Sequence, residues 1–118
     1  MDAAELFRQE TDTVQLEPGE FLYREGDKAE NMYVLLDGEL DIRVGDYVKT
    51  AGAGALIGQA ALIEDRPRAA NAVAKTACRL AKIDRQRFDF IVQQHPQFAT
   101  HAMKSLVEHL HHVTRVGQ

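Results

Sequence analysis

Residues 54–70 read GALIGQAALIEDRPRAA and form the most informative stretch of the chain. They combine a glycine-bounded turn, a short helical turn of small residues, and a proline-fixed loop that ends in Arg68. Small side chains let backbone N–H groups approach an anion, and the start of a helix directs its positive dipole toward one. Arg68 would add a charge-assisted hydrogen bond to phosphate oxygens. Residue chemistry alone is equally consistent with a surface loop that carries a solvated arginine.

Short segments rich in strand formers lie on both sides of this stretch. Between Leu40 and Val44, apolar residues alternate with Asp41 and Arg43, which is typical of a strand with one buried face. Glycine next to proline or aspartate predicts tight turns between the segments. The predicted strands cover residues 21–23, 32–36, 40–44, 72–74 and 78–83. Their regular spacing predicts a mainly β fold, either an antiparallel barrel or a jelly roll, over about residues 10–84. Of these, we expect the antiparallel β-jelly-roll barrel.

The last third of the chain changes to helical periodicity. Asp84 is a predicted N-cap for a helix over residues 85–94, and Pro96 is predicted to open a second helix. We therefore expect a C-terminal helical lid over about residues 85–116. In the second helix, apolar residues recur at spacings of four and three, as in a coiled-coil seam. This seam consists of Ala99, Met103, Leu106, Leu110 and Val113.

The seam allows two arrangements. It would either pair with a second copy of the chain or pack on its own barrel, and we expect a homodimer through the C-terminal helix. Two heptads are marginal on their own, so such a dimer would need other contacts too.

Composition limits the classes of protein to which the chain can belong. Its 118 residues predict one domain over residues 1–118. The formal net charge of −4, with interspersed charges, argues against nucleic-acid binding, and no candidate recognition helix is present. The acidic start does not resemble a secretory signal, and no apolar run is long enough for a membrane span. The single cysteine, Cys78, is expected in the core. We expect a cytoplasmic protein that does not bind membranes.

Residues 54–70 resemble the phosphate-binding cassette of cyclic-nucleotide-binding domains, whose usual form is Phe-Gly-Glu-x-Ala-Leu followed by Pro-Arg-Ala-Ala. The resemblance extends over nearly the whole chain. Residues 18–27 and 32–40 are similar to the family's early strands. Residues 75–78 and the closing helices resemble the sensor domain of catabolite-activator-type bacterial regulators. The resemblance implies a regulatory module that binds cAMP or cGMP, has no cofactor, is not an enzyme, and signals by moving its C-terminal helix.

The resemblance also implies a role for individual residues. Arg68 would pair with the cyclic phosphate, and the backbone amides of Ala61 and Ala69 would complete its cradle. Gly58 would shape the turn, and Thr114 would contact the base, within its own subunit or across a dimer. Guanine-preferring members often carry threonine directly after the arginine, so Ala69 favours cAMP over cGMP.

Two residues depart from the family's usual pattern. Ile57 replaces phenylalanine, and Gln59 replaces the glutamate that accepts the ribose 2′-hydroxyl proton. A neutral hydrogen bond contributes about 0.5–1.5 kcal/mol, against about 1.5–3 kcal/mol for a charged one. Losing ~1–1.5 kcal/mol weakens binding roughly 5- to 15-fold. The alternative function is a degenerate domain of the same fold that binds no nucleotide and acts as a scaffold for a protein effector.

A metal-dependent barrel enzyme is the rival from another class. That chemistry needs histidine and carboxylate ligands that converge from barrel strands. All five histidines lie between His95 and His112, in the predicted helices, so we expect neither catalytic residues nor a metal site. His109 and His112 share a helix face. They would either bind a metal ion across a dimer or be solvated, and we expect them to be solvated.

Overall fold

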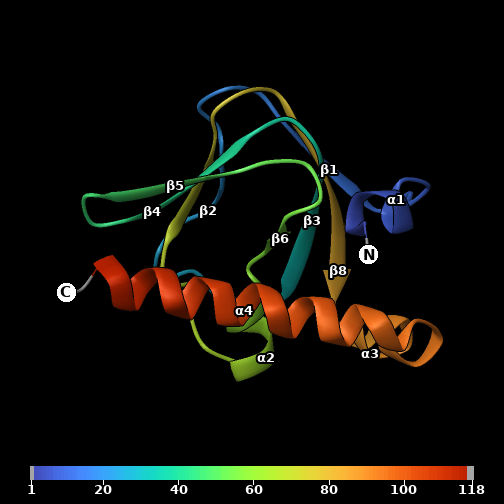
Figure 1. Cartoon of the computed structure of the whole chain (residues 1–118). Helices are drawn as coiled ribbons and strands as arrows, with labels where there is room; N and C mark the ends of the chain where they lie inside the picture. The colour runs from blue at the N-terminus through green and yellow to red at the C-terminus, as the bar shows by residue number, and fades with distance from the viewer. Residues whose placement is uncertain (1, 117–118) are drawn as a thin grey trace.

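The computed structural model describes the backbone of residues 2–116 and the side chains of residues 2–108, and its strands form two antiparallel sheets (Figure 1). The first sheet has the order β1-β8-β3-β6. Its strands are Thr13–Leu16 (β1), Cys78–Asp84 (β8), Asn31–Asp37 (β3) and Leu56–Ile57 (β6). The second sheet has the order β2-β7-β4-β5. Its strands are Phe21–Tyr23 (β2), Asn71–Ala74 (β7), Leu40–Val44 (β4) and Tyr47–Ala51 (β5). The predicted antiparallel fold with C-terminal helices is confirmed.

Residues 2–116 also form four helices. They are Ala3–Phe7 (α1), Gln59–Glu64 (α2), Arg85–Gln94 (α3) and Pro96–Val116 (α4). The predicted N-cap at the start of α3 is confirmed, because the Asp84 carboxylate accepts a hydrogen bond from the Arg87 N–H at 2.7 Å. Pro96 opens α4, also as predicted. The sequence did not predict α1, which Asp2 caps with hydrogen bonds to two N–H groups. In Figure 1, α4 runs lengthwise below the strands, with α2 beside it.

The turn between β3 and β4, which carries the chain from the first sheet to the second, depends on a glycine. Gly38 has a φ of +95°, in the left-handed region that favours glycine. A Cβ atom at this position would lie 2.1 Å from the carbonyl oxygen of Ala77. Because the obstacle is backbone, no side chain fits there, and the turn predicted around residues 37–38 requires glycine.

Strand β3 is apolar along its length because both of its faces are buried. Tyr33 and Leu35 belong to a core cluster that contains residues of both sheets. Met32, Val34 and Leu36 belong to a second cluster, which includes residues of α1, α3 and α4. The helices therefore cover the outer face of the first sheet, and this two-sided burial explains the lack of apolar–polar alternation in β3.

Phe98 anchors the start of α4. Its side chain is fully buried, and its ring makes edge-to-face contacts with Phe7 of α1 and Phe88 of α3, at centroid distances of 5.5 and 5.9 Å. Further along α4, Met103 is 58% exposed and Val107 is 49% exposed. Among the described side chains the predicted seam is divided, since Ala99 and Leu106 are partly buried while Met103 faces solvent. The side chains of Leu110 and Val113 lie outside the described residues.

Cys78 is buried in the core, as predicted. Its Sγ donates to the carbonyl oxygen of Glu39 at 3.1 Å, and burial raises the pKa of the thiol above its ordinary value. Within the described part of the chain, no helix has the length and apolar character needed to cross a membrane.

Candidate functional site

Arg68 is a buried cation at the centre of the candidate site. The residue is 4% exposed. Its Nη1 donates to the carbonyl oxygen of Gly58 at 3.0 Å, and its Nη2 donates to the carbonyl oxygen of Asn31. The Nε is buried without a hydrogen-bond partner, and no ion pair with a carboxylate forms among the described residues. Arg68 is therefore held by neutral groups, and its charge is not neutralised by the side chains around it.

The backbone of Arg68 is fixed by the loop between β2 and β3. Its N–H donates to the carbonyl oxygen of Asp27 at 2.8 Å, and its carbonyl oxygen accepts from the Gly26 N–H at 2.8 Å. Paired backbone groups hold a loop in one conformation because they cannot be released without leaving polar atoms unsatisfied. The arginine is thus positioned by its main chain as well as by its side chain.

Gly58 lies directly beside the guanidinium. It forms the N-cap of α2 in the left-handed conformation, with a φ of +76°. A Cβ atom at Gly58 would lie 2.3 Å from Arg68 Nη1. Glycine therefore serves two purposes here: it permits the turn into α2, and it leaves room for the guanidinium to reach the Gly58 carbonyl.

Gln59 connects α2 to the C-terminal helix. Its side chain is 5% exposed, and its Nε2 donates to Oγ of Ser105 in α4 at 3.0 Å. The predicted ribose-binding residue is therefore a direct link between the cassette and α4. This link joins residues that are 46 positions apart in the sequence.

The remaining predicted residues have different surroundings. Ala61 lies in the first turn of α2, where N–H groups have no acceptor within the helix. Its carbonyl oxygen accepts a hydrogen bond from the Arg66 N–H at 3.1 Å. Ala69 is exposed next to Arg68. Thr114 belongs to α4, but its side chain lies outside the described residues, so its contact with a base stays a prediction.

The side chains of His109 and His112 also lie outside the described residues. Among the side chains that are described, no group of three or more residues is arranged to hold a metal ion.

Comparison with known proteins identifies the family. The family profile described as "Cyclic nucleotide-binding domain" matches residues 13–95. The chain belongs to the cyclic-nucleotide-binding domain family. The matched region contains both sheets, the cassette and α3.

Three similar proteins support this assignment. The domain is 38% identical over 80 residues to the "cAMP-dependent protein kinase regulatory subunit" of Emericella nidulans, covering 65% of this chain and 19% of that protein. A solved structure described as "A cyclic-GMP-dependent signalling pathway regulates bacterial phytopathogenesis" has a TM-score of 0.74 and 25% identity, covering 84% of each chain. The catabolite activator protein of Thermus thermophilus shares the fold, with a TM-score of 0.73 and 21% identity over 86% of this chain and 51% of that one.

These relatives indicate the general class of protein to which the chain belongs. It is a domain of the cyclic-nucleotide-binding family, and it is similar to part of the regulatory subunits of cAMP-dependent protein kinase. The domain spans 19–20% of the length of the curated relatives it matches, which are much longer proteins.

The sequence did not point to three residues of the site. Tyr23 carries the ring that lies over Arg68, Asn31 supplies a carbonyl oxygen to it, and Ser105 bonds Gln59. Asn31 acts through its backbone, so its residue type gives no signal. Tyr23 pairs with Ala72 across β2 and β7, close to Arg68, but only this strand register brings the tyrosine to the site.

Proposed function

We propose that this domain is a non-enzymatic sensory module that binds a 3′,5′-cyclic nucleotide through Arg68. The buried, unpaired charge of Arg68 carries the proposal. Burying an ion without a counter-charge costs several kcal/mol. Two carbonyl dipoles and a tyrosine ring offset part of this cost, but they leave the positive charge and a free Nε. A cyclic phosphate would supply the missing anion.

The other predicted residues would surround the nucleotide in the same proposal. Gln59 would accept the ribose hydroxyl proton through Oε1 while its Nε2 bonds Ser105. Gly58 would keep the approach to Arg68 open, because a side chain there would collide with the guanidinium. The remaining proposed ligand contacts are Ala61, Ala69 and Thr114.

We propose cAMP as the preferred ligand over cGMP. Alanine at position 69 offers no hydroxyl to a guanine base, and the Emericella nidulans relative is named for cAMP dependence. A structural relative is named for a cyclic-GMP-dependent pathway, so both nucleotides belong in every titration.

The proposed signal is a movement of α4. Gln59 lies at the proposed ribose position and bonds Ser105 of α4, so a ligand that shifts Gln59 changes a contact of the helix. A ligand shifts such an equilibrium only through its different affinity for the two positions. The Gln59–Ser105 hydrogen bond is one contact that would differ between them.

Titration with cyclic nucleotides tests the proposed function. A ligand that binds only the native state stabilises it by about 2.7 kcal/mol at 100 times its Kd. For a domain of this size that corresponds to a rise in Tm of roughly 5–13 °C. We expect this rise with cAMP, a smaller one with cGMP at equal concentration, and saturable heat in calorimetric titration. 5′-AMP, which lacks the cyclic phosphate, is the control and should have less effect.

A degenerate domain is the alternative function. It would retain the fold, bind no nucleotide and act as a scaffold for a protein effector. An unchanged Tm in millimolar cAMP, cGMP and a cyclic dinucleotide would contradict nucleotide binding and favour the scaffold.

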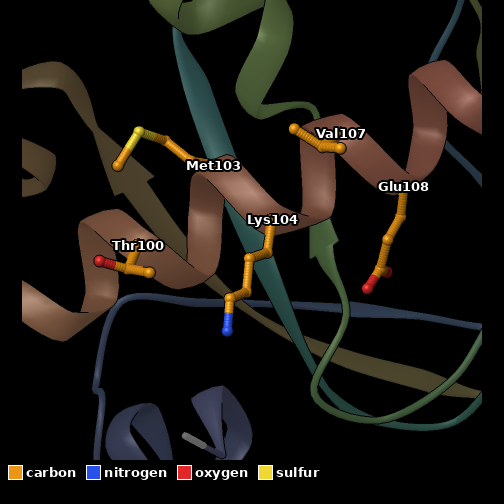
Figure 2. A pocket seen from close by; sticks show the side chains of 5 residues that line it. All are labelled: Thr100, Met103, Lys104, Val107 and Glu108. Atoms are coloured by element: carbon orange, nitrogen blue, oxygen red, sulfur yellow. The ribbon is translucent and has the colours of Figure 1, made fainter.

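We also propose a homodimer through α4. Exposed Met103 and Val107 support it, since large apolar side chains on a helix surface mark interaction sites when they are adjacent. With their neighbours they line a surface hollow of about 370 Å³ (Figure 2). The lining residues are Thr100, Met103, Lys104, Val107 and Glu108.

Replacing Met103 with aspartate tests the dimer. Its exposure means that the fold should tolerate the change, whereas a dimer would have to bury a charge without a partner. We expect Met103→Asp to sediment as a monomer with an unchanged circular dichroism spectrum. Val48→Asp, at a similarly exposed apolar residue on β5, is the control and should remain dimeric. An unmodified protein that sediments as a monomer at high micromolar concentration would contradict the dimer.

The domain organisation, cellular location and partners of the chain are also proposals. We propose that residues 1–118 act as one unit, with a barrel over about residues 10–84 and a lid over about residues 85–116. The unit would act in the cytoplasm through a protein effector, without binding nucleic acid or a membrane. The net charge of −4 supports this setting, because phosphate-rich surfaces repel an acidic protein.

A further inference from the structure

The guanidinium of Arg68 lies over an aromatic ring. Its Cζ is 4.2 Å from the ring centroid of Tyr23 in β2 and 5.9 Å from that of Tyr33 in β3. A guanidinium within about 6 Å of a ring centroid is attracted by the electrons of the ring face. Tyr23 is much the nearer ring, so it dominates this interaction.

The ring limits the orientations open to the guanidinium. Both Nη atoms are already directed by the carbonyl oxygens of Gly58 and Asn31, and the ring lies against the guanidinium. Of the three nitrogen atoms, only Nε remains without a protein partner among the described residues. The three contacts together fix the plane of the guanidinium, while Nε–H and the second N–H of each Nη have no protein acceptor in the part of the chain that the structure describes.

The Tyr23 ring also stabilises the charge of Arg68 without neutralising it, so the charge remains available to an anionic ligand. A carboxylate in the same place would neutralise Arg68 and compete with an anionic ligand for it. A neutral phenol does neither. Burial raises the pKa of the Tyr23 hydroxyl, and although the nearby Arg68 charge opposes this, the net direction is upward. The ring therefore stays uncharged at neutral pH.

We propose that Tyr23 is a positioning residue for Arg68: its ring holds the guanidinium plane and stabilises its charge without a carboxylate, so that Arg68 is oriented in advance for an anion. The anion is the cyclic phosphate of the proposed function, on which this part of the inference rests. The orientation of Arg68 itself does not depend on any ligand and can be measured without one.

Two substitutions at Tyr23 separate the ring from its hydroxyl. Tyr23→Leu removes the ring, and we expect it to weaken cAMP binding by about 3- to 30-fold, the range that corresponds to one cation–π contact. Tyr23→Phe keeps the ring and should bind cAMP within about twofold of the unmodified protein, since the hydroxyl has no part in the stacking.

Phe21 offers a matched control on the same strand. The Cζ of Arg24 lies 3.7 Å from its ring centroid, so Phe21→Leu also removes a cation–π contact, but one made by the exposed Arg24 and not by Arg68. It should leave cAMP affinity unchanged. Equal weakening by Phe21→Leu and Tyr23→Leu would mean that the loss reflects disturbance of β2, and would overturn the proposal.

The Arg68 Nε–H resonance in nuclear magnetic resonance spectra gives a readout without ligand. A group stacked on a ring face is shielded, so this resonance should move on Tyr23→Leu and stay in place on Tyr23→Phe. If the unmodified protein binds no cAMP, the proposed function fails, and this shift alone decides whether Tyr23 positions Arg68. If cAMP binds equally to Tyr23→Leu, or the resonance does not move in that variant, the positioning role is wrong.

Discussion

Arg68→Ala is expected to weaken cAMP binding by about 30- to 5,000-fold, because truncating one partner of a buried charge pair costs about 2–5 kcal/mol. The size of the effect follows from burial, since at 4% exposure solvent would screen a bound phosphate very little. Calorimetric titration measures it directly. Arg68→Lys keeps the charge but not the fork of donors, so we expect its affinity to lie between those of the unmodified protein and Arg68→Ala.

The experiment must distinguish unfolding of the Arg68→Ala variant from loss of its binding site. Arg68→Ala leaves the carbonyl oxygens of Gly58 and Asn31 without their donors, at about 1–3 kcal/mol each. Removal of the uncompensated charge offsets this loss, so circular dichroism should show a folded domain. Arg66→Ala is the matched control in the same loop: its side chain is 75% exposed and pairs with the exposed Glu64. Affinity that falls equally in both variants, or a folded Arg68→Ala that binds normally, would contradict the role of Arg68.

Phe98→Ala is expected to destabilise the domain by about 3–5 kcal/mol, the usual cost of removing a buried phenylalanine. Phe98 is fully buried and stacks edge-to-face on Phe7 and Phe88, so the variant loses contacts with two other helices at once. Domains of this kind are stable by only about 5–15 kcal/mol. Urea unfolding followed by circular dichroism measures the difference.

The same substitution at an exposed phenylalanine is the control. Phe90 lies in α3, is 52% exposed and has Arg87 Cζ 5.9 Å from its ring centroid, so Phe90→Ala should cost only about 1 kcal/mol of the free energy of unfolding. Equal losses in the two variants would mean that Phe98 does not anchor α4. An anchored start of α4 matters for the proposed signal, because it leaves the middle of the helix, at Ser105, as the part that responds to Gln59.

Many local features of the domain were predictable from its sequence, although β1 and β5 were not among the predicted strands. Glycine beside aspartate marked the β3–β4 turn, alternation marked β4, and Asp84 and Pro96 marked the starts of α3 and α4. Each of these signals depends on residues within a few positions of one another. Strand β6 has only two residues and α1 only five, too few for a periodic pattern to be recognised.

The surroundings of Arg68 and Gln59 were decided by tertiary structure alone. The sequence indicated that both residues belong to the cassette, but not that one would be buried without a carboxylate or that the other would bond α4. Asn31 and Ser105 lie 37 and 46 positions from their partners in the chain. Such contacts depend on strand register and helix packing. Strand register and helix packing follow from burial summed over the whole core, so no local sequence pattern encodes these contacts. A backbone carbonyl such as that of Asn31 is present at every residue, so the residue type gives no signal either.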